Sequence, residues 1–79
     1  MSLTTENRFK TIVAGQMMMN SQDHIQPESS LKSDLGADEL DRIEIAFAVE
    51  DEFNISVELE EWDDVDTVEE AIELIESSS

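Results

Sequence analysis

The stretch Asp34-Leu35-Gly36-Ala37-Asp38-Glu39-Leu40-Asp41 decides how this chain is organised. Gly36 permits a tight turn, because glycine adopts backbone conformations that other residues avoid. Asp38 is suited to cap a helix that starts directly after the turn, and Asp41, three residues later, completes a capping-box-like pair. The stretch therefore predicts a helix start with Glu39 in the first turn, where the helix dipole favours a carboxylate.

The helix that follows, from Leu40 to Phe53, has two apolar stripes on nearly opposite sides, since successive residues turn by about 100°. The first stripe consists of Ile45, Val49 and Phe53. The second consists of Leu40, Ile43 and Phe47. We expect the first to enter the core, with Arg42 extending along its edge or lying at the rim.

Acidic residues border the second stripe: Glu39, Glu44, Glu50 and Asp51. Either another helix covers this stripe or it stays partly exposed. We favour exposure, because only two further short apolar segments remain to cover it. An apolar strip in an acidic frame is typical of a helix that docks on a hydrophobic site with a basic rim.

Three further helical segments flank this one. A first helix is predicted over residues 5–18, capped by Thr4 or Thr5, with apolar residues at helical spacing. A short helical turn is expected over residues 59–62, with Trp62 at the edge of the core. A final helix begins after Asp66 or Thr67 and buries a face formed by Val68, Ala71, Ile72 and Ile75.

The connections are predicted to be loops. Residues 20–32 contain Pro27 and several Ser and Asn residues, so we expect a long loop that is anchored by Ile25 and Leu31. Asn54 is a plausible helix stop, and residues 55–58 form an extended loop, because no pairing strand is available. The predicted fold is all-α, with three main helices, one short helix and a long first loop.

Length and composition limit the class of protein. Seventy-nine residues suit one domain, 1–79, in which Met1-Ser2-Leu3 is treated as a cloning remnant and Ser77-Ser78-Ser79 as a frayed tail. Four basic against 21 acidic residues give a net charge of −17, which opposes binding to nucleic acid and anionic membranes and favours basic protein surfaces. No signal peptide or spanning segment is evident, so a cytoplasmic monomer is expected.

Candidate chemical groups are sparse. His24 has no second His or Cys with which to share a metal, and the acidic turn 63–66 lacks the calcium-loop spacing, so no metal is expected. Met17-Met18-Met19 is interpreted as packing at a helix end, with a Met-rich binding surface as the alternative. No phosphate loop or hydrolase triad is present, so we do not expect an enzyme.

Several segments together resemble the acyl carrier proteins of fatty-acid and polyketide synthesis. They are residues 35–41, Glu44, residues 50–53 and the later Thr67-Val68-Glu69-Glu70-Ala71-Ile72. The resemblance extends from about Thr5 to Ile75. It implies an acyl-carrier-type bundle with the same order of loops and helices.

In that family, a serine at the start of the second helix receives 4'-phosphopantetheine from coenzyme A. The matching position here is Glu39. The resemblance implies that this site is not competent, because the transferase needs a hydroxyl and a carboxylate would yield a labile anhydride. Ser29, Ser30, Ser33 and Ser56 lie outside the motif, so no cofactor is expected on this chain.

The resemblance also implies a partner-binding surface. The matching positions are Asp38, Leu40, Ile43, Glu44, Phe47, Glu50 and Asp51. We therefore expect an acidic protein-binding module that meets basic surfaces of carrier-dependent enzymes in fatty-acid, lipid or polyketide-type biosynthesis. The alternative is a genuine acyl carrier protein whose serine was exchanged for Glu39 by engineering.

Glu39 has two interpretations at this point. In the first, the attachment serine is lost and a residue that suits a helix N-terminus remains. In the second, the negative charge of Glu39 partly imitates the phosphate of the modified carrier.

Overall fold

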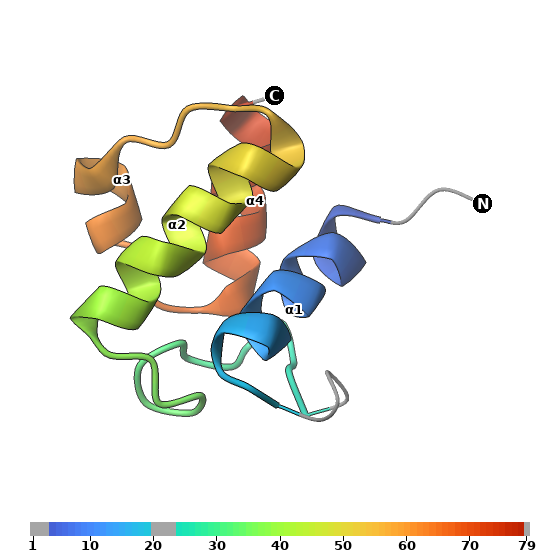
Figure 1. The fold of residues 1–79 in the computed structure, drawn as a ribbon, viewed down its shortest axis with the longest axis vertical. Helices are drawn as coiled ribbons and strands as arrows, with labels where there is room; N and C mark the ends of the chain where they lie inside the picture. Colours follow the sequence, from blue (N-terminus) through green and yellow to red (C-terminus); the bar gives the residue numbers. More distant parts are fainter. Residues whose placement is uncertain (1–3, 20–23, 79) are drawn as a thin grey trace.

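The computed structural model describes residues 4–19 and 24–78, and within them the chain is all-α. Its four helices are α1 (Thr5–Gln16), α2 (Glu39–Phe53), α3 (Leu59–Asp63) and α4 (Val68–Ser78). In Figure 1, α2 crosses the middle of the molecule, with α1 on one side, α3 on the other and α4 behind it. The predicted all-α class is confirmed: there are three main helices and one short helix, with a long loop between α1 and α2.

One stripe of α2 enters the core, as expected. Ile45 and Val49 are fully buried, and Ala46 joins them. Phe53 is only half-buried, because it lies at the edge of the core beneath the Arg8 guanidinium, 4.2 Å from the ring centre. Arg8 also forms a 3.0 Å ion pair with Glu52, so this end of α2 is fastened to the start of α1.

The other stripe of α2 is largely uncovered. Leu40 is 63% exposed and Phe47 is 56% exposed, while Ile43 is half-buried. The expectation that no other helix covers this stripe is therefore confirmed for its two outer residues.

The long loop between α1 and α2 is tied to the start of α4. Ile25 and Leu31 are fully buried, which confirms both predicted anchors. The amide of Leu31 donates to the carbonyl of Asp66 at 2.8 Å, and the amide of Val68 donates to the carbonyl of Ser29 at 3.0 Å. The part of this loop at residues 20–23 lies outside the described residues.

Some helix ends differ from the sequence expectation. Helix α1 ends at Gln16 and not at residue 18, because Met18 has a left-handed backbone (φ 56°) that stops the helix. Met18 is 90% exposed, whereas Met17 and Met19 pack against the core. Helix α4 continues to Ser78 and so includes Ser77 and Ser78 of the expected tail; Met1-Ser2-Leu3 and Ser79 lie outside the described residues.

Other local predictions are confirmed. Thr4 caps α1 by accepting from the amide of Asn7 at 3.1 Å, and Asn54 ends α2 in a left-handed conformation. Residues 55–58 form no strand. Over the part of the chain that is described, the only bridge joins Ser30 and Thr67. None of the helices described has the length and apolar content to cross a bilayer.

Trp62 is more central than predicted. It is 2% exposed and meets Phe9 edge-to-face, with ring centres 6.4 Å apart. Its indole nitrogen donates to the carbonyl of Arg42 at 2.7 Å. This hydrogen bond satisfies the polar end of the ring, which is why the short helix can bury it completely.

A capping box built by Thr67 and Glu70 starts α4. The Thr67 hydroxyl accepts from the amide of Glu70 at 3.2 Å, and the Glu70 carboxylate accepts from the amides of Thr67 and Asp66 at 3.0 and 3.1 Å. The hydrogen bond from the amide of Thr67, followed by that from Asp66, lowers the pKa of Glu70. Thr67 is therefore the cap, while Asp66 accepts a 2.7 Å bond from the Ser30 hydroxyl.

The two stripes of α2 predict unequal losses of stability when a residue of each is truncated. Val49→Ala should lower the free energy of unfolding by about 2 kcal/mol, because it leaves a cavity in a closed core. Phe47→Ala should cost less than about 1 kcal/mol, because the ring is mostly in water. Urea unfolding of both variants measures the difference. A greater loss for Phe47→Ala would show that the ring is a core residue.

The Glu70 cap predicts a pH-dependent difference. A carboxyl whose pKa is lowered in the folded state adds stability above its unfolded pKa, and that stability is lost as the pH falls through the folded value. Glu70→Gln should therefore be less stable than the wild type at neutral pH. The difference should vanish in acid, where Glu70 is itself neutral. Thermal unfolding from neutral to acidic pH measures it, and a constant difference would contradict the role of the charge.

Candidate functional site

The turn before α2 places Glu39 at the first position of that helix. Asp38 accepts from the amide of Asp41 at 2.9 Å, and the Asp41 carboxylate accepts from the amide of Asp38 at 3.3 Å. The predicted capping box is therefore confirmed. Gly36 takes a positive φ of 76°, as the tight turn requires. The amide of Ala37 donates to the carbonyl of Leu31, which joins the turn to the buried loop anchor.

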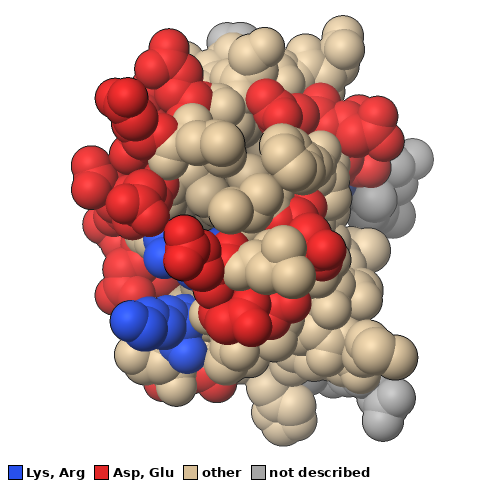
Figure 2. Space-filling view, turned by 60° about the vertical axis from the view of Figure 1, so that its left-hand side comes forward, with Lys and Arg blue, Asp and Glu red and all other residues tan. Residues whose placement is uncertain are grey.

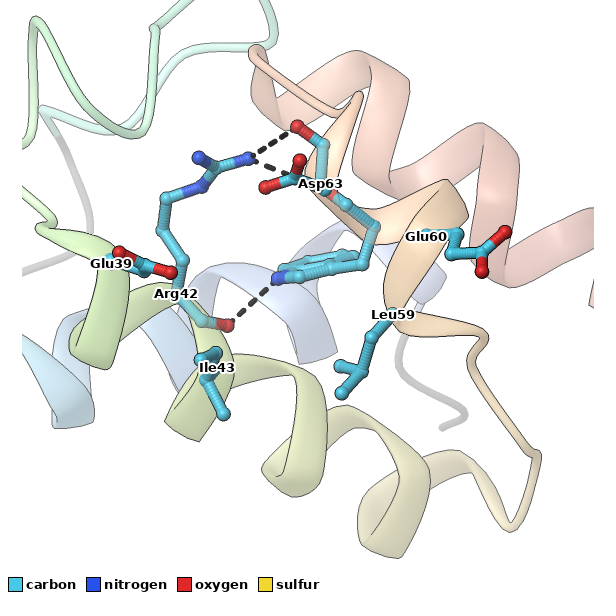
Figure 3. Close-up of a pocket in the computed structure, with 7 residues that line it drawn as sticks. Glu39, Arg42, Ile43, Leu59, Glu60 and Asp63 are labelled. Atoms are coloured by element: carbon cyan, nitrogen blue, oxygen red, sulfur yellow. Dashed lines mark hydrogen bonds between the residues drawn. The ribbon is translucent and has the colours of Figure 1, made fainter.

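Glu39 is exposed and lies at the meeting point of three surface hollows. One of these hollows is a cavity of about 360 Å³ between α2 and α3. Its lining residues are Glu39, Arg42, Ile43, Leu59, Glu60, Trp62 and Asp63. Figure 3 shows Glu39 at the N-terminal end of α2, with Ile43 and Leu59 contributed by the two different helices.

An apolar strip extends along this cavity and beyond it. We call it the α2–α3 strip: Leu40, Ile43 and Phe47 from α2, and Leu59 from α3. Leu59 is 49% exposed and was missed by the sequence reasoning. A signal was present, because Leu59 stands alone among Glu58, Glu60 and Glu61, as an apolar residue within an acidic frame.

Most of the predicted acidic frame is exposed, but one member is bound within the protein. Asp38, Glu44 and Asp51 are exposed, and Glu44 also accepts a hydrogen bond from the side-chain amide of Gln16. Glu50 is half-buried and accepts from the amide of Val57 at 2.8 Å, so it holds the loop after α2. In Figure 2, acidic side chains stand on both sides of an uncharged area of the surface.

Two of the four cations pair away from the acidic frame, and the other two lie near Glu39. Arg8 pairs with Glu52, and Lys10 pairs with Glu6 at 2.7 Å. Arg42 is directed into the protein, while Lys32 is exposed and lines a hollow with Glu39. These four cations are far outnumbered by the 21 acidic residues, and the chain keeps a net charge of −17.

Arg42 is half-buried, and its guanidinium contacts the end of α3. Its Nη2 atom donates to the carbonyls of Trp62, Asp63 and Val65 at 3.3, 3.2 and 2.7 Å. Its Nε is buried with no hydrogen-bond partner among the described atoms. The guanidinium thereby meets the carbonyl oxygens at and just after the end of α3, of which that of Trp62 also accepts from the amide of Val65 at 3.0 Å.

The geometry does not assemble a metal centre from the residues that are described. No group of three or more His, Cys, Asp or Glu side chains there is arranged to hold an ion. His24 is exposed in the first loop, as expected.

A comparison with protein families matches residues 7–75 to the family described as phosphopantetheine attachment site. The match includes α1, α2 and α3 and reaches Ile75 in α4. The chain belongs to this family. Its members are carrier domains and not catalysts, and they bind 4'-phosphopantetheine, so the chain has a carrier-protein-like character.

The family cofactor provides a chemical test of the site. Phosphopantetheine is held through a phosphodiester, whose formation requires a hydroxyl on the protein. None of the residues from Asp34 to Asp41 has one. Ser29 and Ser30 are buried in the loop beneath, Ser33 is exposed in the same loop, and Ser56 lies in the loop beyond α2. No hydroxyl side chain therefore stands at the start of α2.

Proposed function

We propose that this chain is an acidic docking module with a carrier-protein fold, and that it carries no phosphopantetheine on Glu39. It binds carrier-dependent enzymes of fatty-acid, lipid or polyketide-type biosynthesis through an apolar patch with a basic rim on the enzyme. The observation that supports this most is the exposure of Leu40 and Phe47 within an acidic frame, directly beside Glu39.

Charge and apolar area support the same kind of partner. Exposed apolar strips are unfavourable in water and gain free energy when a partner covers them. The frame around this strip repels acidic surfaces and attracts basic ones. The proposed contact residues are Asp38, Leu40, Ile43, Glu44, Phe47 and Asp51, with Glu50 contributing charge from the edge.

Glu39 occupies the position that the family motif assigns to the attachment serine. A carboxylate that attacked the pyrophosphate of coenzyme A would form an acyl-phosphate anhydride, which water cleaves readily. The exposed carboxylate instead suits the first turn of α2, where the helix dipole favours a negative charge. We further propose that residues 1–79 act as one monomeric module in the cytoplasm.

The proposal predicts the outcome of a modification assay. After incubation with coenzyme A and a phosphopantetheinyl transferase of broad range, the wild-type chain should keep its mass. Glu39→Ser should gain one phosphopantetheine arm, because Asp38 and Leu40 still frame the position. Intact-mass spectrometry reads both results.

Glu73→Ser is the matched control, since it places a serine on an exposed helical position outside the docking surface. It should not be modified. Addition of the arm to the wild-type chain would overturn the proposal for Glu39. Failure of Glu39→Ser to accept the arm would show that the surrounding surface no longer fits the transferase.

The docking surface predicts a loss of affinity for Phe47→Ala. Binding of the same transferase, without coenzyme A, should weaken about fivefold or more, because the variant removes exposed apolar area at the centre of the contact. Isothermal titration measures the dissociation constant. Met18→Ala truncates an exposed side chain outside the α2–α3 strip and should bind like the wild type. Equal affinity of Phe47→Ala and the wild type would contradict the assigned surface.

A further inference from the structure

Helix α3 has little intrinsic stability of its own. It has only five residues, and its N-cap residue Glu58 makes no side-chain capping hydrogen bond. Its last turn contains no basic residue that could interact with the C-terminal carbonyls. Isolated helices of this length do not persist in water, so contacts with the rest of the protein must hold α3 in place.

Arg42 of α2 supplies the cation that α3 lacks. Its Nη2 atom donates to the carbonyls of Trp62 and Asp63, the last two residues of α3, and to that of Val65 just beyond. A basic side chain at a helix C-terminus satisfies unpaired carbonyls and opposes the negative end of the helix dipole. Figure 3 shows the Arg42 guanidinium reaching across to the end of α3 near Asp63.

A second contact in the opposite direction links the same two helices. The indole nitrogen of Trp62 donates to the main-chain carbonyl of Arg42 at 2.7 Å. Trp62 is buried, and Leu59 lies three residues before it, so both point to one side of the short helix. Both also line the cavity that Ile43 lines from α2. The place of Leu59 at the surface therefore depends on the contacts at the other end of α3.

We infer that Arg42 is a positioning residue for the docking surface: by capping the C-terminal end of α3, it holds Leu59 beside Ile43 in the α2–α3 strip. This inference rests on the proposed function. Arg42 itself is half-buried and directs its Nη2 donors inward, so it does not need to touch the partner. Its effect on binding is exerted through Leu59.

Amide hydrogen exchange tests the capping role. The amides of Trp62, Asp64 and Val65 donate within or just after α3. In Arg42→Met they should exchange about tenfold faster or more, while the amide of Val49 in the core of α2 changes little. Arg42→Lys, which keeps a charged donor, should restore part of the protection.

Lys32→Met is the matched control, because it removes the same charge from an exposed neighbouring position. It should leave exchange in α3 unchanged. Unchanged protection of α3 in Arg42→Met would overturn the inference, and so would an equal increase throughout all four helices.

A double-mutant cycle tests the link to binding, with the transferase as the probe. Leu59→Ala should weaken binding about threefold in the wild-type background and hardly at all in Arg42→Met, where Leu59 is already displaced. Equal losses in both backgrounds, or no loss in either, would overturn the inference. Phe47→Ala, measured in parallel, separates the two claims: if it leaves affinity unchanged while α3 exchange responds to Arg42, the proposed function fails and the capping of α3 by Arg42 stands.

Discussion

The chain has enough apolar surface to cover one stripe of α2 but not both, and the rest of the structure depends on that constraint. Ile45 and Val49 take the buried side, which packs against α1, and the long first loop closes the core with Ile25 and Leu31. Leu40 and Phe47 are left in water on the other side. Because the remaining helix on that side, α3, has five residues, it borders the exposed stripe and does not cover it.

Electrostatics turns this uncovered stripe into a selective surface. Three of the four basic residues make contacts within the protein: Arg8, Lys10 and Arg42. Arg8 and Lys10 pair with Glu52 and Glu6, which are not part of the acidic frame, whereas Arg42 lines the cavity together with Glu39. Because 21 acidic residues stand against only four basic ones, the surface of the protein suits a basic partner. The few positive charges thus stabilise the fold, while the excess of negative charge is available for recognition.

Local sequence signals predicted both ends of α2 well, because helix caps depend on residues that are close together in the sequence. Asp38 with Asp41 and the stop at Asn54 follow from such short-range rules. The exposed stripe was also predictable, since helical periodicity alone separates Phe47 from Val49. The contributions of Arg42 and Leu59 were not, because both depend on how α3 lies against α2. Trp62 was placed too far outward for the same reason, since its burial requires the carbonyl of Arg42.

The central claim is that this carrier fold presents a working docking surface even though Glu39 stands at the attachment position. Its most direct test is a titration of ¹⁵N-labelled wild-type chain with a phosphopantetheinyl transferase, followed by amide chemical shifts. The account predicts that the largest changes cluster at Leu40, Ile43, Phe47 and Leu59 and weaken with added salt. Changes centred on α1 or α4, or no changes at any transferase concentration, would contradict it.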